Sequence, residues 1–394
     1  MPKILNYGRQ SVDDRDISAV ADALETDYLT TGPRVEAFEA MLCEITGAEH
    51  CIACANGTAA LHLACLALNV GKGDVGLTSP ISFLASANCI EYCGGRADFI
   101  DIDPGTLCLC PQQLDLYCRE NKPPKVVIPV DFAGLGADLA AIAELSKKHG
   151  FSLVEDAAHA LGSFYQAEGE RYACGSCTHT DLAVFSFHPV KTITTGEGGA
   201  VMTNDRSLAE RVRCLRNHGM VRHDALLQQH GGWAYEMSSL GFNYRITDIQ
   251  CALGVSQLSR LDRFTNRRRQ IVSMYNHAFS KHDNLVLPHQ DLALNACPHL
   301  YPIRLKDGAA KRRQVYERLK ADNIFCQVHY IPIYFQPYYA DKYGYAKGRC
   351  PQAERYYSQA LSLPLFPAMS DRDALRVIER FQFALGSASS HRKM

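Results

Sequence analysis

Short apolar runs alternate with helical segments through the first half of the chain, and this alternation restricts the possible folds more than any other feature. Several of the runs are rich in β-branched or aromatic residues, as strands are. They lie at residues 51–55, 96–103, 125–131, 151–155, 182–187 and 199–203. Strands separated by helices pair mainly in parallel and are covered by helices on both faces. We therefore predict an α/β protein built on a mainly parallel sheet.

Helix signals stand between these runs. The motif at 56–58 precedes an apolar helical run over 59–68, and an amphipathic run over 138–149 ends at Gly150. Near the amino terminus, residues 16–24 place apolar side chains on one helical face.

A longer helical stretch begins with a capping box formed by Thr247 and Gln250 and continues, with a break, towards residue 282. The arginines at 267–269 are predicted to lie on a solvated face of this stretch.

The length of 394 residues exceeds what one small core needs, so two domains are expected. Beyond the long helical stretch the chain contains more Pro and Tyr and shorter elements. We place the boundary within that stretch, with a large domain over 1–265 and a smaller C-terminal α+β domain over 266–394. Residues 387–390 and the basic end after them are predicted to be a frayed tail.

The charges nearly balance, with 41 Lys and Arg against 42 Asp and Glu. No global field therefore attracts nucleic acid or an acidic membrane, and an anionic ligand must be held by a local site. No run approaches the roughly 20 apolar residues that span a bilayer, and the first residues do not resemble a signal peptide. We expect a cytoplasmic protein.

The sixteen cysteines include two Cys-x-x-Cys pairs, Cys51/Cys54 and Cys174/Cys177. Together the pairs offer four thiolates, which is the number a structural zinc site uses. The first pair lies in an apolar run that is typical of a buried strand, where Cys packs as a small hydrophobe. The second pair lies in a Gly-, Ser- and Thr-rich loop and is the better metal candidate. Packing thiols remain the favoured interpretation of both pairs, with no metal.

Polar residues stand at or just beyond the ends of predicted strands, at Asp156, Ser186 and Lys191. Ligands of open parallel sheets bind outside the carboxyl ends of the strands, so these side chains are expected to converge. Lys191 follows a Pro and precedes a Gly-rich turn, which would hold it rigidly. A Lys held in this way suits a Schiff base, because its amine must lose a proton before it attacks an aldehyde.

Two further motifs point to the same cofactor. Asp156 ends an apolar strand, where a carboxylate needs a cation or hydrogen bonds, and a pyridinium nitrogen would be such a cation. A simple cap on the next turn is an equal alternative. The motif Asn56-Gly57-Thr58 opens a helix whose free N–H groups could cradle a phosphate, although it is also a common N-cap. In combination the three motifs predict pyridoxal 5'-phosphate.

The chain resembles the DegT/StrS-type sugar-nucleotide aminotransferases over nearly its whole length. The matching motifs are LTTGPRVEAFE (29–39), NGTAALHLA (56–64), SPISFLASAN (79–88), EDAAHALG (155–162), FSFHPVK (185–191), TTGEGGAVMTND (194–205) and GFNYRITDIQCALG (241–254). The resemblance implies a pyridoxal-phosphate-dependent transferase fold of type I, similar to aspartate aminotransferase. Residues 6–7, 78–83 and 327–334 are similar to members that act in pseudaminic acid biosynthesis. Those members transfer an amino group from L-glutamate to C4 of a UDP-linked 4-keto-6-deoxy-N-acetylhexosamine.

The resemblance also implies roles for individual residues. Lys191 would bind the cofactor, Asp156 would pair with its ring nitrogen, and His159 would lie near its O3 edge. The phosphate and the ring face would be contacted by Gly57, Thr58, Ser186 and Phe83, and by Asn243 from the neighbouring subunit of a homodimer. The sugar-nucleotide pocket would be lined by Tyr7, Tyr28, Leu29, Thr30, Gln327, Val328, His329 and Tyr330.

Each of these residues has a plainer alternative. Phe83 also fits an ordinary core position, and Tyr7 fits a surface aromatic. His329 fits a hydrogen-bonded core histidine, and Asn243 fits a turn residue. The sequence departs from the family at two places. Thr31 stands where relatives often have Gln, and Asn56-Gly57 stands in place of a Ser-Ala pair.

Three other functions compete with this one. An aminotransferase for another UDP- or dTDP-linked keto sugar is the nearest alternative. A 3-dehydrase of the same fold would carry His in place of Lys191. A non-catalytic regulator that binds pyridoxal phosphate or zinc is the most distant.

Overall fold

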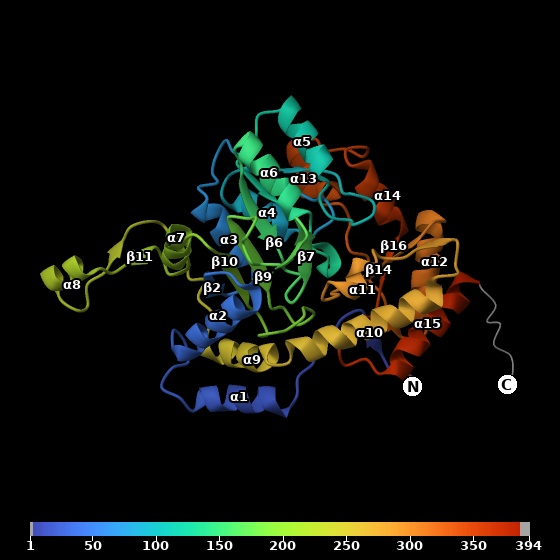
Figure 1. The fold of residues 1–394 in the computed structure, drawn as a ribbon, viewed down its shortest axis with the longest axis horizontal. Helices are drawn as coiled ribbons and strands as arrows, with labels where there is room; N and C mark the ends of the chain where they lie inside the picture. The colour runs from blue at the N-terminus through green and yellow to red at the C-terminus, as the bar shows by residue number, and fades with distance from the viewer. Residues whose placement is uncertain (1–2, 387–394) are drawn as a thin grey trace.

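The computed structural model describes residues 3–386, so the predicted tail at 387–390 lies outside the described residues. Its centre is a seven-stranded sheet in the order β2-β10-β9-β6-β5-β3-β4 (Figure 1). The strands are β2 (His50–Cys54), β10 (Gly199–Thr203), β9 (Leu182–Ser186), β6 (Ser152–Asp156), β5 (Val126–Ile128), β3 (Val75–Thr78) and β4 (Arg96–Phe99). Only β10 runs antiparallel to its neighbours within this sheet. The predicted α/β fold with a mainly parallel sheet is confirmed.

Helices, short turns and smaller sheets make up the rest of the described chain. The helices are α1 (Asp14–Leu24), α2 (Pro33–Thr46), α3 (Gly57–Ala67), α4 (Ala85–Tyr92), α5 (Pro111–Glu120), α6 (Leu139–His149), α7 (Arg206–Arg216), α8 (Asp224–His230), α9 (Asp248–Leu258), α10 (Leu261–Phe279), α11 (Asp291–Leu294), α12 (Gly308–Ala321), α13 (Pro337–Tyr343), α14 (Pro351–Gln359) and α15 (Asp371–Leu385), with short 3-10 turns η1 (Phe132–Gly134) and η2 (Ile333–Phe335). The smaller sheets are β1 (Leu5–Asn6) with β15 (Ile324–Phe325), β7 (Phe164–Ala167) with β8 (Glu170–Ala173), β11 (Met220–Val221) with β12 (Glu236–Met237), and β13 (Leu285–Val286) with β14 (Tyr301–Leu305) and β16 (Ala360–Leu363).

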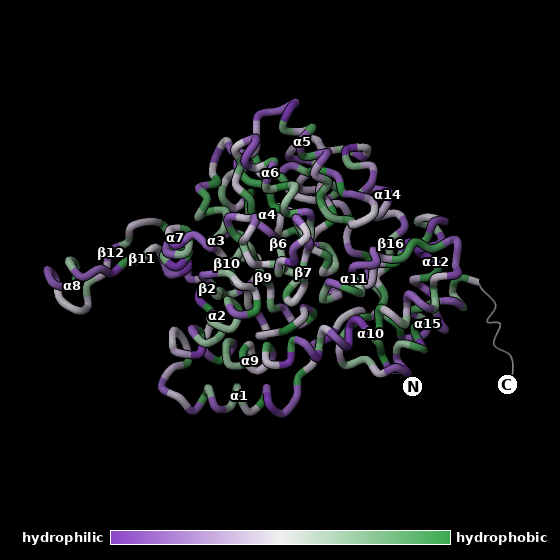
Figure 2. The backbone as a smooth tube through the Cα atoms, viewed as in Figure 1, coloured by the Kyte–Doolittle hydropathy of each residue, from purple (hydrophilic) through white to green (hydrophobic). Residues whose placement is uncertain are grey.

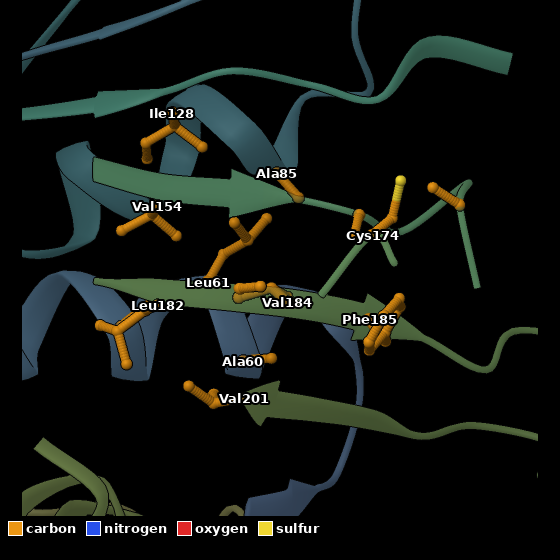
Figure 3. Close-up of a cluster of buried hydrophobic side chains, with 14 of the residues drawn as sticks. Ala60, Leu61, Ala85, Ile128, Val154, Cys174, Leu182, Val184, Phe185 and Val201 are labelled. Atoms are coloured by element: carbon orange, nitrogen blue, oxygen red, sulfur yellow. The ribbon is translucent and has the colours of Figure 1, made fainter. Parts of the chain in front are cut away.

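The central strands are continuous apolar runs because both faces of the sheet are covered (Figure 2). Figure 3 shows Leu61 of α3 between Val154 of β6 and Val184 of β9, all of which are at most 2% exposed. The alternation of strands and helices in the sequence therefore predicted this core correctly. The predicted strand at 96–103 ends early, at Phe99, because the main chain beyond it pairs with residues 108–110 and not with β3: Asp103 N–H donates to the Cys108 carbonyl, and Cys110 N–H to that of Asp101.

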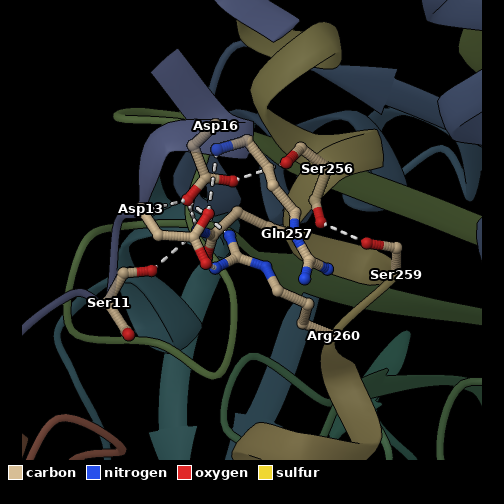
Figure 4. Close-up of polar contacts among 8 residues, drawn as sticks. Ser11, Asp13, Asp16, Ser256, Gln257, Ser259 and Arg260 are labelled. Atoms are coloured by element: carbon tan, nitrogen blue, oxygen red, sulfur yellow. Dashed lines mark hydrogen bonds and ion pairs between the residues drawn. The ribbon is translucent and has the colours of Figure 1, made fainter. Parts of the chain in front are cut away.

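The predicted long helix is two helices, α9 and α10, that meet at Ser259 and Arg260. The capping box of Thr247 and Gln250 is confirmed at the start of α9. Arg260 pairs with Asp13 and Asp16 of the α1 segment, which binds α1 to this junction (Figure 4). The Asp16 carboxylate also accepts hydrogen bonds from the Ser256 hydroxyl and the Gln257 amide, at 2.7 and 2.8 Å.

This network decides which face of α1 is buried. Asp16 is buried, whereas the apolar Ile17 and Leu24 are 62% and 57% exposed. The apolar pattern over 16–24 thus identified a helix, but Ile17, Ala21 and Leu24 are exposed, and it is Asp16 and Ala23 that face inward.

The prediction that the arginines at 267–269 form a solvated face is wrong. Arg268 has no exposed surface, and its guanidinium donates to main-chain carbonyls of other segments. Arg267 and Arg269 also donate to carbonyls, those of Met369 and Ala296. The planar five-donor fork of Arg can satisfy several carbonyls at once, so Arg268 can be buried without a carboxylate partner.

Two large hydrophobic clusters divide most of the interior. One surrounds the central sheet, and the other joins α10, α12, α15, β14 and β16, with Leu5 from β1. Residue 265 lies inside α10, which contributes to both clusters. The division into 1–265 and 266–394 stays a prediction. Among residues 3–386, no helix has the length and apolar character needed to cross a membrane.

We expect Asp16→Ala to lower the free energy of unfolding by about 3 kcal/mol, because it leaves Arg260 buried with only Asp13 as a partner. Urea denaturation followed by circular dichroism measures this difference. The exposed Asp22 on the same helix is the matched control, and Asp22→Ala should change stability by less than about 0.5 kcal/mol. Equal effects of the two changes would contradict the role of the network.

Candidate active site

A cavity of about 930 Å³ opens at the carboxyl ends of β6 and β9 and the start of α3. It collects most of the residues that the sequence indicated. Those that line it are Tyr7, Gly57, Thr58, Phe83, Asp156, His159, Ser186, Lys191, Gln327, Val328, His329 and Tyr330. The other four, Tyr28, Leu29, Thr30 and Asn243, do not line the cavity of their own chain.

Lys191 lies in a tight turn after β9. Its main-chain N–H donates to the His188 carbonyl at 2.8 Å, and the hydroxyl of Thr194 donates to Phe187 at 3.1 Å. Burial lowers the pKa of Lys191 to about 8, although the Asp156 carboxylate acts in the opposite direction. At neutral pH a much larger fraction of this amine is neutral than of an ordinary Lys, which makes it a competent nucleophile.

Asp156 is the last residue of β6 and is buried. One oxygen accepts from the Ser86 hydroxyl at 2.6 Å, and the other accepts from the main-chain N–H of Ala158 at 3.2 Å. The contact with Ala158 is the turn cap that the sequence offered as the alternative role of Asp156. Asp156 therefore both caps the turn and borders the cavity. Burial raises its pKa, while these hydrogen bonds and Lys191 act against the rise.

The start of α3 forms an anion cradle. The Asn56 side chain caps the helix by accepting from Ala59 N–H at 2.8 Å, which leaves the first-turn N–H groups at Gly57 and Thr58 beside the cavity. A Cβ atom on Gly57 would lie 2.8 Å from Cβ of Ser186, so only Gly lets the helix start approach that hydroxyl. N–H groups at a helix start together with hydroxyl groups favour a bound phosphate.

Aromatic side chains and histidines form the opposite wall. The Nε2 atom of His159 lies 3.3 Å from the Tyr330 hydroxyl, and its ring lies 4.3 Å from that of His299. Burial lowers the pKa of both His159 and His299 well below the usual range, so both rings are neutral at pH 7.

His329 and Tyr7 extend this wall. The His329 Nδ1 atom is 2.9 Å from the Ser362 hydroxyl, and its ring is 5.0 Å from that of Tyr7. His329 is thus a hydrogen-bonded buried histidine, as its plainer alternative held, and it also lines the cavity. Phe83 is 58% exposed, so the plainer interpretation of this residue as core is wrong.

The four residues that miss the cavity lie in two exposed segments. Tyr28 and Leu29 are 57% and 47% exposed, and Asn243 is also exposed. A β-bridge joins Thr30 to Thr247, so the first segment adjoins the start of α9. Asn243 precedes Thr247 by four residues and is bridged to Asn217.

The sequence pattern of the DegT/DnrJ/EryC1/StrS aminotransferase family matches residues 10–382. The chain belongs to this family. It is 37% identical over 379 residues to the spore coat polysaccharide biosynthesis protein SpsC of Bacillus subtilis, with 95% of each chain covered. It is 36% identical over 375 residues to a UDP-4-amino-4,6-dideoxy-N-acetyl-beta-L-altrosamine transaminase of Campylobacter jejuni, which covers 94% of this chain and 95% of the relative.

Solved structures agree with this assignment. Helicobacter pylori PseC, an aminotransferase involved in the biosynthesis of pseudoaminic acid, superposes with a TM-score of 0.89 at 31% identity and covers 98% of this chain and 100% of PseC. The PLP form of Spr1654 from Streptococcus pneumoniae, described as a sugar aminotransferase, gives a TM-score of 0.88 at 26% identity and covers 98% and 99%. The protein is therefore a sugar aminotransferase and an enzyme, which argues against the non-catalytic regulator.

Two residues of this aminotransferase site were not identified from the sequence. Ser86 lies inside a recognised motif, but only the structure shows that its hydroxyl donates to Asp156. His299 borders the cavity from a segment far along the chain, just before β14. Neither spacing nor local pattern connects His299 to His159, because their contact is made by tertiary packing.

Both Cys-x-x-Cys pairs consist of buried free thiols. Cys174 lies with Asp131 and Glu155 in a buried group whose potential ligand atoms are within 4.8 Å of one another. Burial raises the pKa of Asp131 to about 6 and that of Glu155 further above its usual range. Two buried carboxyl groups this close favour sharing a proton over ionising together.

We expect Lys191 to react with an amine reagent at an unusually low pH. In protein stripped of small molecules, labelling by trinitrobenzenesulfonate should reach half its maximal rate near pH 8, because only the neutral amine reacts. Asp156→Asn removes a carboxylate that raises the Lys191 pKa, so the midpoint should fall further. Peptide mass spectrometry at a series of pH values measures both.

The internal control is Lys147, which pairs with Glu144 on the surface and has a raised pKa. It should label only at higher pH. If Lys191 and Lys147 reached half-maximal labelling at the same pH, the amine of Lys191 would not be buried.

Proposed function

We propose that this enzyme transfers an amino group from L-glutamate to C4 of a UDP-linked 4-keto-6-deoxy-N-acetylhexosamine, in a pathway to pseudaminic acid. Its cofactor is pyridoxal 5'-phosphate. The observation that carries the proposal is the convergence of a low-pKa lysine, a buried carboxylate and an anion cradle in one cavity. The names of the relatives support the choice of sugar.

The residues present fit this cofactor. Lys191 offers an amine to its aldehyde, and Asp156 offers a buried carboxylate to its ring nitrogen. Asp156 has no ion-pair partner among the described side chains within 4 Å, so a pyridinium would supply the missing cation. The start of α3 and the Ser186 hydroxyl offer donors to the phosphate. These three positions are the sequence motifs from which the cofactor was predicted.

The chemistry divides between cofactor and protein. When bound, pyridoxal phosphate supplies an aldehyde that captures amines and a ring that withdraws electrons from the reacting carbon. The Asp156 carboxylate holds a proton on the ring nitrogen and so maintains that withdrawal. The Nζ atom of Lys191 would take the proton from the donor α-carbon in the first half of the reaction and would deliver a proton to C4 of the sugar in the second half.

The wall residues orient the reactants. We assign His159, held by Tyr330, to the O3 edge of the cofactor and Phe83 to its ring face. Tyr7 and residues 327–330 line the part of the cavity left for the sugar nucleotide. The neutral state of His329, whose pKa burial lowers to about 3, suits an uncharged sugar and not an anion at that position.

An assay with a panel of acceptors tests the substrate. The purified enzyme is incubated with L-glutamate and UDP- or dTDP-linked 4-keto-6-deoxy sugars, and products are identified by mass spectrometry and NMR. We expect amination of the UDP-linked N-acetyl sugar to have the highest kcat/KM, and Lys191→Ala to abolish it. Preference for a dTDP sugar would replace the proposed substrate with the nearest alternative.

We further propose that the working unit is a homodimer with shared sites. An arm over 218–241, which contains β11, α8 and β12, projects from the body (Figure 1). It carries exposed apolar side chains: Trp233 and Leu240 are each 79% exposed, Met237 65% and Tyr235 59%. Exposed apolar groups of this extent favour a protein partner. Asn243 stands at the base of the arm, and Thr30 is bridged to Thr247 four residues further on, so both exposed segments are placed to reach a partner's cavity.

Mixing two defective variants tests this sharing. Lys191→Ala lacks the amine, and Asn243→Ala should weaken cofactor affinity about tenfold to a hundredfold by loss of a charge-assisted hydrogen bond. A mixed dimer would have one site with both defects and one with neither. We therefore expect activity to appear on mixing, measured with the best acceptor at limiting cofactor.

The control is a mixture of Lys191→Ala with Asp156→Asn, both of which act within one chain's cavity in this structure. That mixture should stay inactive. If Lys191→Ala and Asn243→Ala exchange subunits, as shown by native mass spectrometry, and still regain nothing, Asn243 does not serve a partner.

A further inference from the structure

Arg268 of α10 is a fully buried cation without a carboxylate partner among the described residues. Its guanidinium donates only to main-chain carbonyls. These belong to Leu365 at 2.9 Å, Pro298 and His299 at 3.3 Å, and Lys191 at 3.4 Å. One side chain therefore connects three segments that are remote from one another in the sequence.

Two of these segments carry groups of the active site. The carbonyl of Lys191 belongs to the residue whose amine enters the cavity, and the carbonyl of His299 belongs to the residue whose ring packs on His159. The third segment, at Leu365, follows β16, and Leu365 belongs to the second hydrophobic cluster. Arg268 thus fixes the main chain of Lys191 and the support of His159 to a common point.

The energetics favour a role beyond ordinary stability. Taking a guanidinium out of water without a counterion is costly, so burying Arg268 here needs a return from the carbonyls that it bonds. The Nε atom of Arg268 also has no partner among the described residues, so the carbonyl contacts do not satisfy it completely. The two terminal nitrogens of the guanidinium nevertheless reach main-chain carbonyls of three segments at once, and the single ammonium of a Lys does not have this fork geometry.

We propose that Arg268 is a positioning residue of this active site, which sets Lys191 and, through His299, His159 in their working geometry. The inference rests on the proposed function of Lys191 as the residue that captures the cofactor. It assigns no contact of Arg268 with substrate or cofactor.

Arg268→Lys tests the proposal, because it keeps a buried charge and loses the fork. Arg267→Lys is the matched control on the same helix, since Arg267 donates to the Met369 carbonyl and pairs with Asp371, and it does not contact Lys191. Each variant is freed of cofactor and mixed with pyridoxal phosphate in a stopped-flow spectrometer. The growth of the visible absorbance band gives the rate at which Lys191 captures the aldehyde.

We expect Arg268→Lys to slow this capture, and to lower kcat, by about tenfold, because a small displacement of a reacting group costs rate steeply. KM for the sugar should stay within about twofold, because the residues that line its pocket are not touched by Arg268. Arg267→Lys should match the wild type in all three measurements.

The outcomes separate the two proposals. If wild-type protein forms no visible band and borohydride fixes no cofactor on Lys191, the proposed function fails. If the wild type forms the band and Arg268→Lys captures the cofactor at the same rate, this inference is overturned and the proposed function stands. Should Arg268→Lys not fold, Arg268→Met is measured in the same way. Failure of both variants to fold would overturn the inference, since Arg268 would then be a structural brace.

Discussion

Burial of ionisable groups at one edge of the central sheet is the constraint on which the site depends. Lys191 and Asp156 lie in a setting that disfavours their charged forms, and three histidines nearby are held neutral. An isolated lysine in water would be almost fully protonated at pH 7 and would be a poor nucleophile. The fold therefore makes its amine reactive by removing water and by keeping other charges few.

The rest of the chain supports that edge from several directions. The parallel strands bring Asp156 and Ser186 to the same side, and the start of α3 adds its N–H groups. The α9–α10 junction is joined to α1 by the pair of Arg260 with Asp16, and α10 then carries Arg268 to the Lys191 turn. Two buried arginines, Arg260 and Arg268, thus link the packing of α1 with the turn that carries Lys191.

Local patterns in the sequence predicted much of this structure because they act over short distances. The apolar runs correctly predicted β2, β5, β6, β9 and β10, and the capping residues correctly predicted the starts of α3 and α9. The cofactor residues were also recognisable, since each stands at the end of a strand or the start of a helix. Most of the residues named from the family resemblance converge in the cavity for the same reason.

The sequence by itself determined the α/β architecture, the family and the position of Lys191, Asp156 and the anion cradle, because periodicity, caps and motifs are encoded in adjacent residues. Only the tertiary structure decided that Arg268 is buried, that Asp16 and not Ile17 faces inward, and that His299 supports His159. It also placed Asn243 and Tyr28 outside their own cavity. These outcomes depend on which carbonyls, carboxylates and rings distant segments present to one another, and no local pattern records that.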